Sequence, residues 1–209
     1  MTAINVYNQR PADLPGQSPL HHAGFEQLIG KGRPNAGVRL RERKLLGHLT
    51  LRGDAKDPAF SGGVHQALGL ELPVALGLVA KGESSLQWMG PDEWLLIVPR
   101  GEEYATELRL REALAGQHFQ VVNVSGGQTI LELKGDKVRD MLMKSTSYDV
   151  HPDNFPVGKA VGTVFAKSQL VIRHTAENTW ELLVRRSFAD YIWLWLQDAC
   201  AEFGLAIDA

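Results

Sequence analysis

The sequence repeats itself at an interval slightly longer than 80 residues. Residues 49–54 (LTLRGD) match residues 131–136 (LELKGD) at an offset of 82, and Trp94 to Val98 match Trp180 to Val184 at an offset of 86. Between them, Pro73-Val74 has a counterpart in Pro156-Val157. Because the three matches occur in the same order with slowly growing offsets, they indicate a duplicated unit of about 80 residues.

Each copy of the repeat reads as strand, helix, strands, helix. Alternating apolar residues predict half-buried strands at 49–51 and 130–133. Asp57 before Pro58, and Asp136 before an apolar helical spacing, predict helix starts. Further strands are expected at residues 86–88, 94–98, 119–122, 161–165, 170–173 and 180–184, and closing helices at 102–115 and 187–203. The sequence therefore predicts an α+β fold of two related β-α-β-β-α halves, each sheet covered on one side by helices.

The first 36 residues differ from the rest because prolines and glycines interrupt any regular pattern. We expect an extended N-terminal arm at 1–36, a first half at 37–125 and a second half at 126–209. The arm is either a frayed tail or a segment ordered by packing on a partner. Phe25 and Leu28 would give it apolar surface to bury.

The last expected helix, residues 187–203, has the clearest periodicity in the chain. Ser187 and Asp190 have the spacing of a capping box. One apolar stripe contains Phe188, Ile192, Trp195, Leu196, Ala199 and Phe203. Trp193 and Leu194 fall outside it, so they belong either to the exposed remainder of a wide core face or to a surface that contacts another chain.

The composition excludes several classes of protein. In 209 residues, 22 Lys and Arg nearly balance 24 Asp and Glu, which disfavours binding to nucleic acid or an anionic membrane. The single cysteine, Cys200, excludes an intrachain disulfide and a zinc site built from several thiolates. No signal peptide and no apolar span of membrane length are present, so a cytoplasmic location is expected.

Motifs that carry chemistry are absent. There is no P-loop, dinucleotide fingerprint or G-x-S-x-G elbow. The acidic candidates Asp92, Glu93, Asp149 and Asp153 have the context of turns. Seven histidines show no metal-binding spacing: His21, His22, His48, His65, His118, His151 and His174. Arg185-Arg186 precede the last helix as surface charge. We therefore predict no catalytic, cofactor-binding or metal-binding residue on this chain.

Four segments resemble the gamma subunits of heterotetrameric sarcosine oxidases. They are Gly90 to Leu96 (GPDEWLL), Asn123 to Ser125, Leu133 to Asp136 and Arg186 to Tyr191 (RSFADY). The resemblance extends from Ser18 to the terminal helix. That family is in turn similar to the folate-binding fold of the glycine-cleavage aminomethyltransferases, whose two related halves agree with the repeat.

The resemblance implies a subunit of a flavin-dependent oxidoreductase complex that demethylates sarcosine to glycine. It implies alpha, beta and delta partner subunits that carry FAD, FMN, NAD, tetrahydrofolate and zinc, while this chain carries no cofactor and has a structural role, packing mainly on alpha. The paired-acid loop of the aminomethyltransferases is missing here. The alternatives are a free-standing tetrahydrofolate-binding aminomethyltransferase-like protein and an adaptor for other partners.

Overall fold

Two copies of one order of elements form the body of the chain in a computed structural model, which describes residues 16–209. The first unit contains β2 (Gly47–Arg52), α2 (Pro58–Leu68), β3 (Leu78–Lys81), β4 (Ser84–Gly90), β5 (Glu93–Val98), α3 (Glu103–Ala113) and β6 (Gln120–Asn123). The second contains β7 (Gln128–Lys134), α4 (Val138–Ser145), β8 (Ala160–Phe165), β9 (Ser168–Ala176), β10 (Thr179–Arg185), α5 (Ala189–Ala199) and β11 (Leu205–Ile207). The predicted α+β fold of two related halves is confirmed, with β1, β3 and β11 as strands that the sequence pattern did not indicate.

The register of the strands establishes the repeat residue by residue. In the first unit Leu51 of β2 lies opposite Trp94 of β5. In the second unit Leu133 of β7 lies opposite Trp180 of β10. These are the pairs that the two sequence offsets predict. Both tryptophans are only 1% exposed, so each anchors the core of its own unit.

The two sheets differ by one inserted strand. The first sheet has the order β3-β4-β5-β2-β6, and the second has the order β8-β9-β10-β7-β1-β11. Strand β1 (Val38–Arg43) is antiparallel to β7 and parallel to β11. It therefore separates β7 from β11, whereas β2 and β6 of the first unit are paired directly. The division into 1–36, 37–125 and 126–209 stays a prediction. Strand β1 lies within the predicted first half, but it pairs with β7 and β11 in the sheet of the second half.

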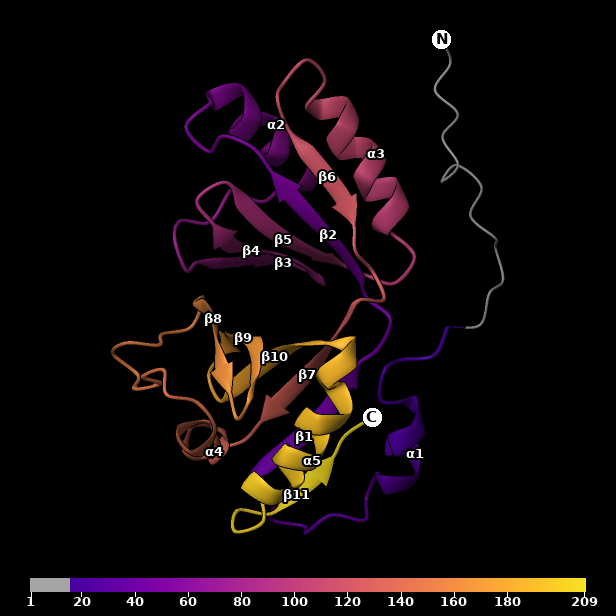
Figure 1. The fold of residues 1–209 in the computed structure, drawn as a ribbon, viewed down its shortest axis with the longest axis vertical. Helices are drawn as coiled ribbons and strands as arrows, with labels where there is room; N and C mark the ends of the chain where they lie inside the picture. Colours follow the sequence, from indigo (N-terminus) through magenta and orange to yellow (C-terminus); the bar gives the residue numbers. More distant parts are fainter. Residues whose placement is uncertain (1–15) are drawn as a thin grey trace.

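The sheets face each other, and the long helices cover their outer faces (Figure 1). One apolar core lies between α2, α3 and the first sheet, and another between α4, α5 and the second sheet. A third, smaller cluster joins the inner faces and includes Leu95 and Ile97 of β5 with Val171 and Leu183 of the second sheet. None of the helices within residues 16–209 has the length and apolar character needed to span a membrane.

The predicted helix starts have different outcomes. Asp57 does cap α2, since its carboxylate accepts a hydrogen bond from the Ala59 amide at 2.8 Å. Asp136 does not cap α4, which begins one residue later than expected, with Lys137 at the N-cap and no side-chain bond. The capping box at Ser187 is also wrong, because that residue lies in a 3-10 turn, η2 (Arg186–Phe188), that precedes α5. The chain enters α4 and α5 through backbone turns, so the side chains of Asp136 and Ser187 do not cap these helices.

The apolar stripe of α5 is rotated from its expected position. Trp193, expected outside the stripe, is 8% exposed and packs edge-on against Phe25 with ring centroids 4.7 Å apart. Trp195, expected at its centre, is half-buried and donates from Nε1 to Ser145 Oγ at 3.0 Å. Phe188 is 40% exposed and Leu194 57%. The arm covers one flank of α5, and this burial draws Trp193 into the core.

The described part of the arm, residues 16–36, packs on the body of its own chain. It contains a 3-10 turn, η1 (His21–Ala23), and the short helix α1 (Phe25–Leu28), and it buries Leu20 and Phe25. Ser18 donates to the Glu42 carboxylate at 2.7 Å. Residues 1–15, the remainder of the arm, lie outside the described residues.

Candidate functional site at the junction of the two sheets

The acidic residues singled out in the sequence lie on the surface and do not form a pair. Asp92 is in the β4–β5 turn, and its carboxylate accepts a hydrogen bond from Arg52 at 2.7 Å. Glu93 opens β5 beside the same arginine. Asp149 accepts a hydrogen bond from the amide of His151 at 2.9 Å, as a turn residue does, and Asp153 is 93% exposed. These carboxylates organise turns and offer no acid–base pair.

The histidines and the cysteine are equally dispersed. Within residues 16–209, no three His, Cys, Asp or Glu side chains lie close enough together to hold a metal ion. His22 contacts Asp190 and His65 contacts Glu71, each at 2.9 Å and each on the surface. Cys200 is buried at the end of α5, where burial raises the pKa of its thiol to about 11. A thiol with that pKa stays protonated and is a poor nucleophile at neutral pH.

The strongest concentration of buried polar groups lies instead where the two sheets meet. Backbone hydrogen bonds join the units symmetrically there: the Leu78 amide donates to the Gly158 carbonyl, and the Ala160 amide donates to the Leu76 carbonyl, both at 2.8 Å. The second pair lies 82 residues beyond the first, which is also the offset of the repeat. A pseudo-twofold axis therefore passes between these segments.

Beside the apolar contact, one arginine crosses from the second sheet to the first. Arg173 of β9 is 1% exposed and donates from its guanidinium to Ser85 Oγ of β4 at 2.6 Å. Its Nε lies 3.3 Å from the Glu181 carboxylate, which also accepts a hydrogen bond from Arg43 of β1 at 2.6 Å. Three strands of one sheet and a strand of the other thus share a single buried ionic cluster.

His48 of β2 lies within this cluster and is 1% exposed. Within residues 16–209, neither of its ring nitrogens has a hydrogen-bond partner. Burial, followed by the charges of Arg173 and Arg43, lowers the pKa of His48 to about 4. The imidazole is therefore neutral at physiological pH. A proton on the ring would add a third positive charge beside Arg43 and Arg173, which share the single carboxylate of Glu181.

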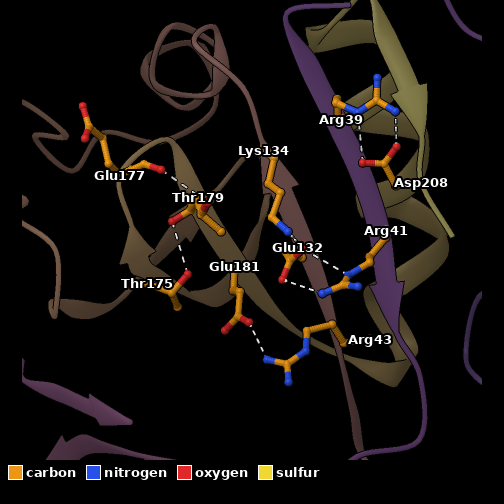
Figure 2. A network of polar contacts seen from close by, with 10 residues as sticks. All are labelled: Arg39, Arg41, Arg43, Glu132, Lys134, Thr175, Glu177, Thr179, Glu181 and Asp208. Atoms are coloured by element: carbon orange, nitrogen blue, oxygen red, sulfur yellow. Dashed lines mark hydrogen bonds and ion pairs between the residues drawn. The ribbon is translucent and has the colours of Figure 1, made fainter. Parts of the chain in front are cut away.

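The ionic cluster continues outward along the inner face of the second sheet (Figure 2). Arg41 of β1 contacts Glu132 of β7 at 3.0 Å, and Lys134 contacts the same carboxylate at 2.8 Å. Burial would raise the pKa of Glu132, but the hydrogen bonds and charges of Lys134 and Arg41 outweigh it and lower the pKa. At the edge of the sheet, Arg39 forms two hydrogen bonds with Asp208. Every arginine of β1 therefore meets a carboxylate on a neighbouring strand.

This ionic cluster is better suited to holding the two sheets together than to catalysing a reaction. Arg173, Glu181 and His48 are closed to solvent, and the first two are paired with each other, so a substrate atom has no approach to them. A cavity of about 440 Å³ opens on the inner face of the second sheet, and Met89 of the first unit also lines it. Its lining provides a single charged side chain, Arg185, and no acid–base pair.

No sequence motif marks Arg43, Arg173 or Glu181 as site residues. A signal was available, since Arg173 and Glu181 interrupt otherwise apolar strands and β1 carries arginine at every second position. A charged residue inside an apolar strand indicates a buried ion pair or a site.

The fold defines a class: a two-unit α+β body of the aminomethyltransferase type. A solved structure of the glycine cleavage system aminomethyltransferase T from Bartonella henselae matches 90% of this chain and 58% of that chain, with a TM-score of 0.64 and 13% identity, which shows the fold alone.

The particular family follows from closer matches. The model of the "Sarcosine oxidase, gamma subunit family" matches residues 52–202. Sarcosine oxidase subunit gamma from Corynebacterium sp. (strain P-1) is 33% identical over 90% of this chain and 91% of its own, and that from Arthrobacter sp. is 34% identical over the same shares. A chain of the heterotetrameric sarcosine oxidase from Corynebacterium sp. U-96 matches 90% of this chain and 96% of its own, with 30% identity and a TM-score of 0.80. This chain belongs to the sarcosine oxidase gamma subunit family.

Proposed function

We propose that this chain is a non-catalytic subunit that stabilises a heterotetrameric sarcosine oxidase in the cytoplasm. The observation that carries the proposal is the junction of the two sheets, where Arg173 and Glu181 are buried and paired with each other, while the partly buried Arg43 also binds Glu181. A site that must admit a substrate cannot be closed in this way. The similarity to a chain of a heterotetrameric enzyme over almost its whole length supports membership in such an assembly.

The finer parts of the proposal concern the partners. We infer that alpha, beta and delta subunits complete the complex, that this chain packs mainly on alpha, and that FAD, FMN, NAD, tetrahydrofolate and zinc are held by those subunits. No catalytic, cofactor-binding or metal-binding residue is proposed on this chain. Its role is to contribute surface to the assembly, and turnover depends on it only through the integrity of the complex.

Co-expression of the four subunits with and without this chain tests the proposal. Without it, we expect incomplete assembly on size-exclusion chromatography and a loss of sarcosine-dependent turnover, restored when the purified chain is added back. Full assembly with normal turnover in its absence would refute the structural role.

The free-standing tetrahydrofolate binder is the competing function, and the 440 Å³ cavity at the sheet junction is the observation that favours it. Titration calorimetry of the isolated chain with tetrahydrofolate separates the two. Stoichiometric binding would support the transferase-like alternative, and we expect none.

A further inference from the structure

A second cavity, of about 380 Å³, lies where the arm meets α5 and β11. Its walls come from α1 and the residues that follow it, from the last turns of α5 and from β11. Its larger apolar lining residues are Leu28, Trp193, Leu205 and Ile207. Because these side chains belong to three segments distant in sequence, this arm groove exists only while the arm is docked on the body.

Two cations stand at the arm groove without counterions. Lys31 and Arg33 line it and are exposed. Within residues 16–209, no carboxylate lines the groove, and neither cation has an ion pair or a side-chain hydrogen bond. The three arginines of β1 each meet a carboxylate, whereas Lys31 and Arg33 meet none in the described part of the chain. The groove is therefore complementary to a ligand that is both apolar and acidic.

The groove is held in shape by close packing. A Cβ on Gly32 would lie 2.7 Å from the Leu205 carbonyl oxygen, so only glycine lets the arm approach β11 this closely. Trp193 is fixed from the side by Phe25. Cys200, which also lines the groove, is a protonated thiol and supplies no nucleophile. A rigid, unreactive groove is suited to binding, and preorganisation lowers the entropic cost of that binding.

We propose that the arm groove binds an extended segment of a partner subunit in which an apolar side chain lies next to carboxylates. The apolar residue would fill the space over Trp193 and Leu205, and the carboxylates would pair with Lys31 and Arg33. This inference rests on the proposed function, because it names one contact of the assembly. A groove of this volume holds only a few side chains, so it acts as an anchor point within a larger interface.

The test uses the purified full-length chain titrated into the co-expressed complex that lacks it, with the dissociation constant measured at two salt concentrations. The charge-reversed variant Lys31→Glu/Arg33→Glu should bind roughly tenfold more weakly and lose part of its salt dependence. The variant Ala201→Trp, which fills the groove from an exposed lining position, should weaken binding to a similar degree. Lys56→Glu/Lys167→Glu makes the same change in net charge at exposed positions outside the groove, and it should bind like the wild type.

The outcomes separate the two proposals. If the wild-type chain binds and neither groove variant weakens binding, the groove proposal is refuted while the structural role stands. If Ala201→Trp weakens binding but the charge reversal does not, the occupant is not acidic and the proposal also fails. If the wild-type chain does not bind at all, the proposed function itself is refuted. Thermal unfolding of each variant confirms that a loss of binding does not come from a loss of fold.

Discussion

Arg173 and Ser85 join the two halves of the molecule through a 2.6 Å hydrogen bond between strands of different sheets. The same guanidinium pairs with Glu181 of its own sheet. Burial lowers the pKa of Arg173, and the charge of Glu181 opposes that shift, so the carboxylate favours the charged form of the guanidinium. The joint between the halves therefore depends on ionic groups as well as on apolar contact.

Removing the Arg173 side chain should destabilise the chain strongly. Arg173→Ala leaves Glu181 with one cation instead of two and opens space between the sheets, at a cost of about 3 kcal/mol. Arg41→Ala is the matched control, because its ion pair with Glu132 is 40% exposed on the arginine side and should contribute less than about 1 kcal/mol. Urea unfolding of both variants measures the difference, and equal losses would contradict a special role for the joint.

The stability of the chain should fall as the pH is lowered from about 6.5 to about 4. His48 has its pKa lowered to about 4 in the folded chain, so the unfolded chain binds more protons throughout this interval. The expected loss from this group is about 3 kcal/mol. His48→Gln should have a shallower decline, measured by urea unfolding at a series of pH values. Some decline will remain, since His174 also has a lowered pKa. An unchanged slope would show that His48 does not titrate in the sheet junction.

The two tryptophans of α5 should contribute to stability in the opposite order from the one that the sequence pattern predicts, with Trp193 contributing more than Trp195. Trp193→Ala removes a buried ring that packs on Phe25 and should cost about 3–5 kcal/mol. Trp195→Ala removes a half-buried ring and one hydrogen bond to Ser145, at a cost of about 1–2 kcal/mol. Thermal and urea unfolding of the isolated chain rank them, and a larger loss for Trp195→Ala would favour the original stripe.

Adjacent glycines in α2 provide a matched pair of substitutions. A Cβ on Gly62 meets nothing within 4 Å, so Gly62→Ala should stabilise the helix by about 0.5–1 kcal/mol. A Cβ on Gly63 would lie 2.8 Å from the Ala113 carbonyl oxygen of α3, and Gly63→Ala should cost about 1–3 kcal/mol by forcing the helices apart. Stability shifts of the same sign for both variants would contradict the close packing of α2 on α3.

Features that a short segment determines could be predicted from the sequence. Asp57-Pro58 starts α2 as expected, because the cap bond reaches only to Ala59, two residues away, whereas the caps expected at Asp136 and Ser187 do not form. The pairing of Trp94 with Leu51 and of Trp180 with Leu133 also follows from the repeat, since duplicated strands keep their register. Glycines 62 and 63, which weaken a helix locally, are tolerated because one of them permits the contact with α3.

Features that depend on contacts between distant segments could not be predicted. Trp193 is drawn into the core by Phe25, a residue of the arm, and no periodicity within α5 can indicate that. The ion pair of Arg43 with Glu181 joins strands that are not adjacent in the chain.

The insertion of β1 between β7 and β11 makes the second unit discontinuous in sequence. Its sheet needs residues 38–43, which are synthesised before the first unit, and residues 205–207, which are synthesised after it. The first unit, from β2 to β6, is continuous and lies between these two parts, so a ribosome can release it complete while β1 still has no neighbour to pair with. Pairing of β11 with β1 is therefore a late event with high contact order, and folding should be limited by this contact between strands more than 160 residues apart.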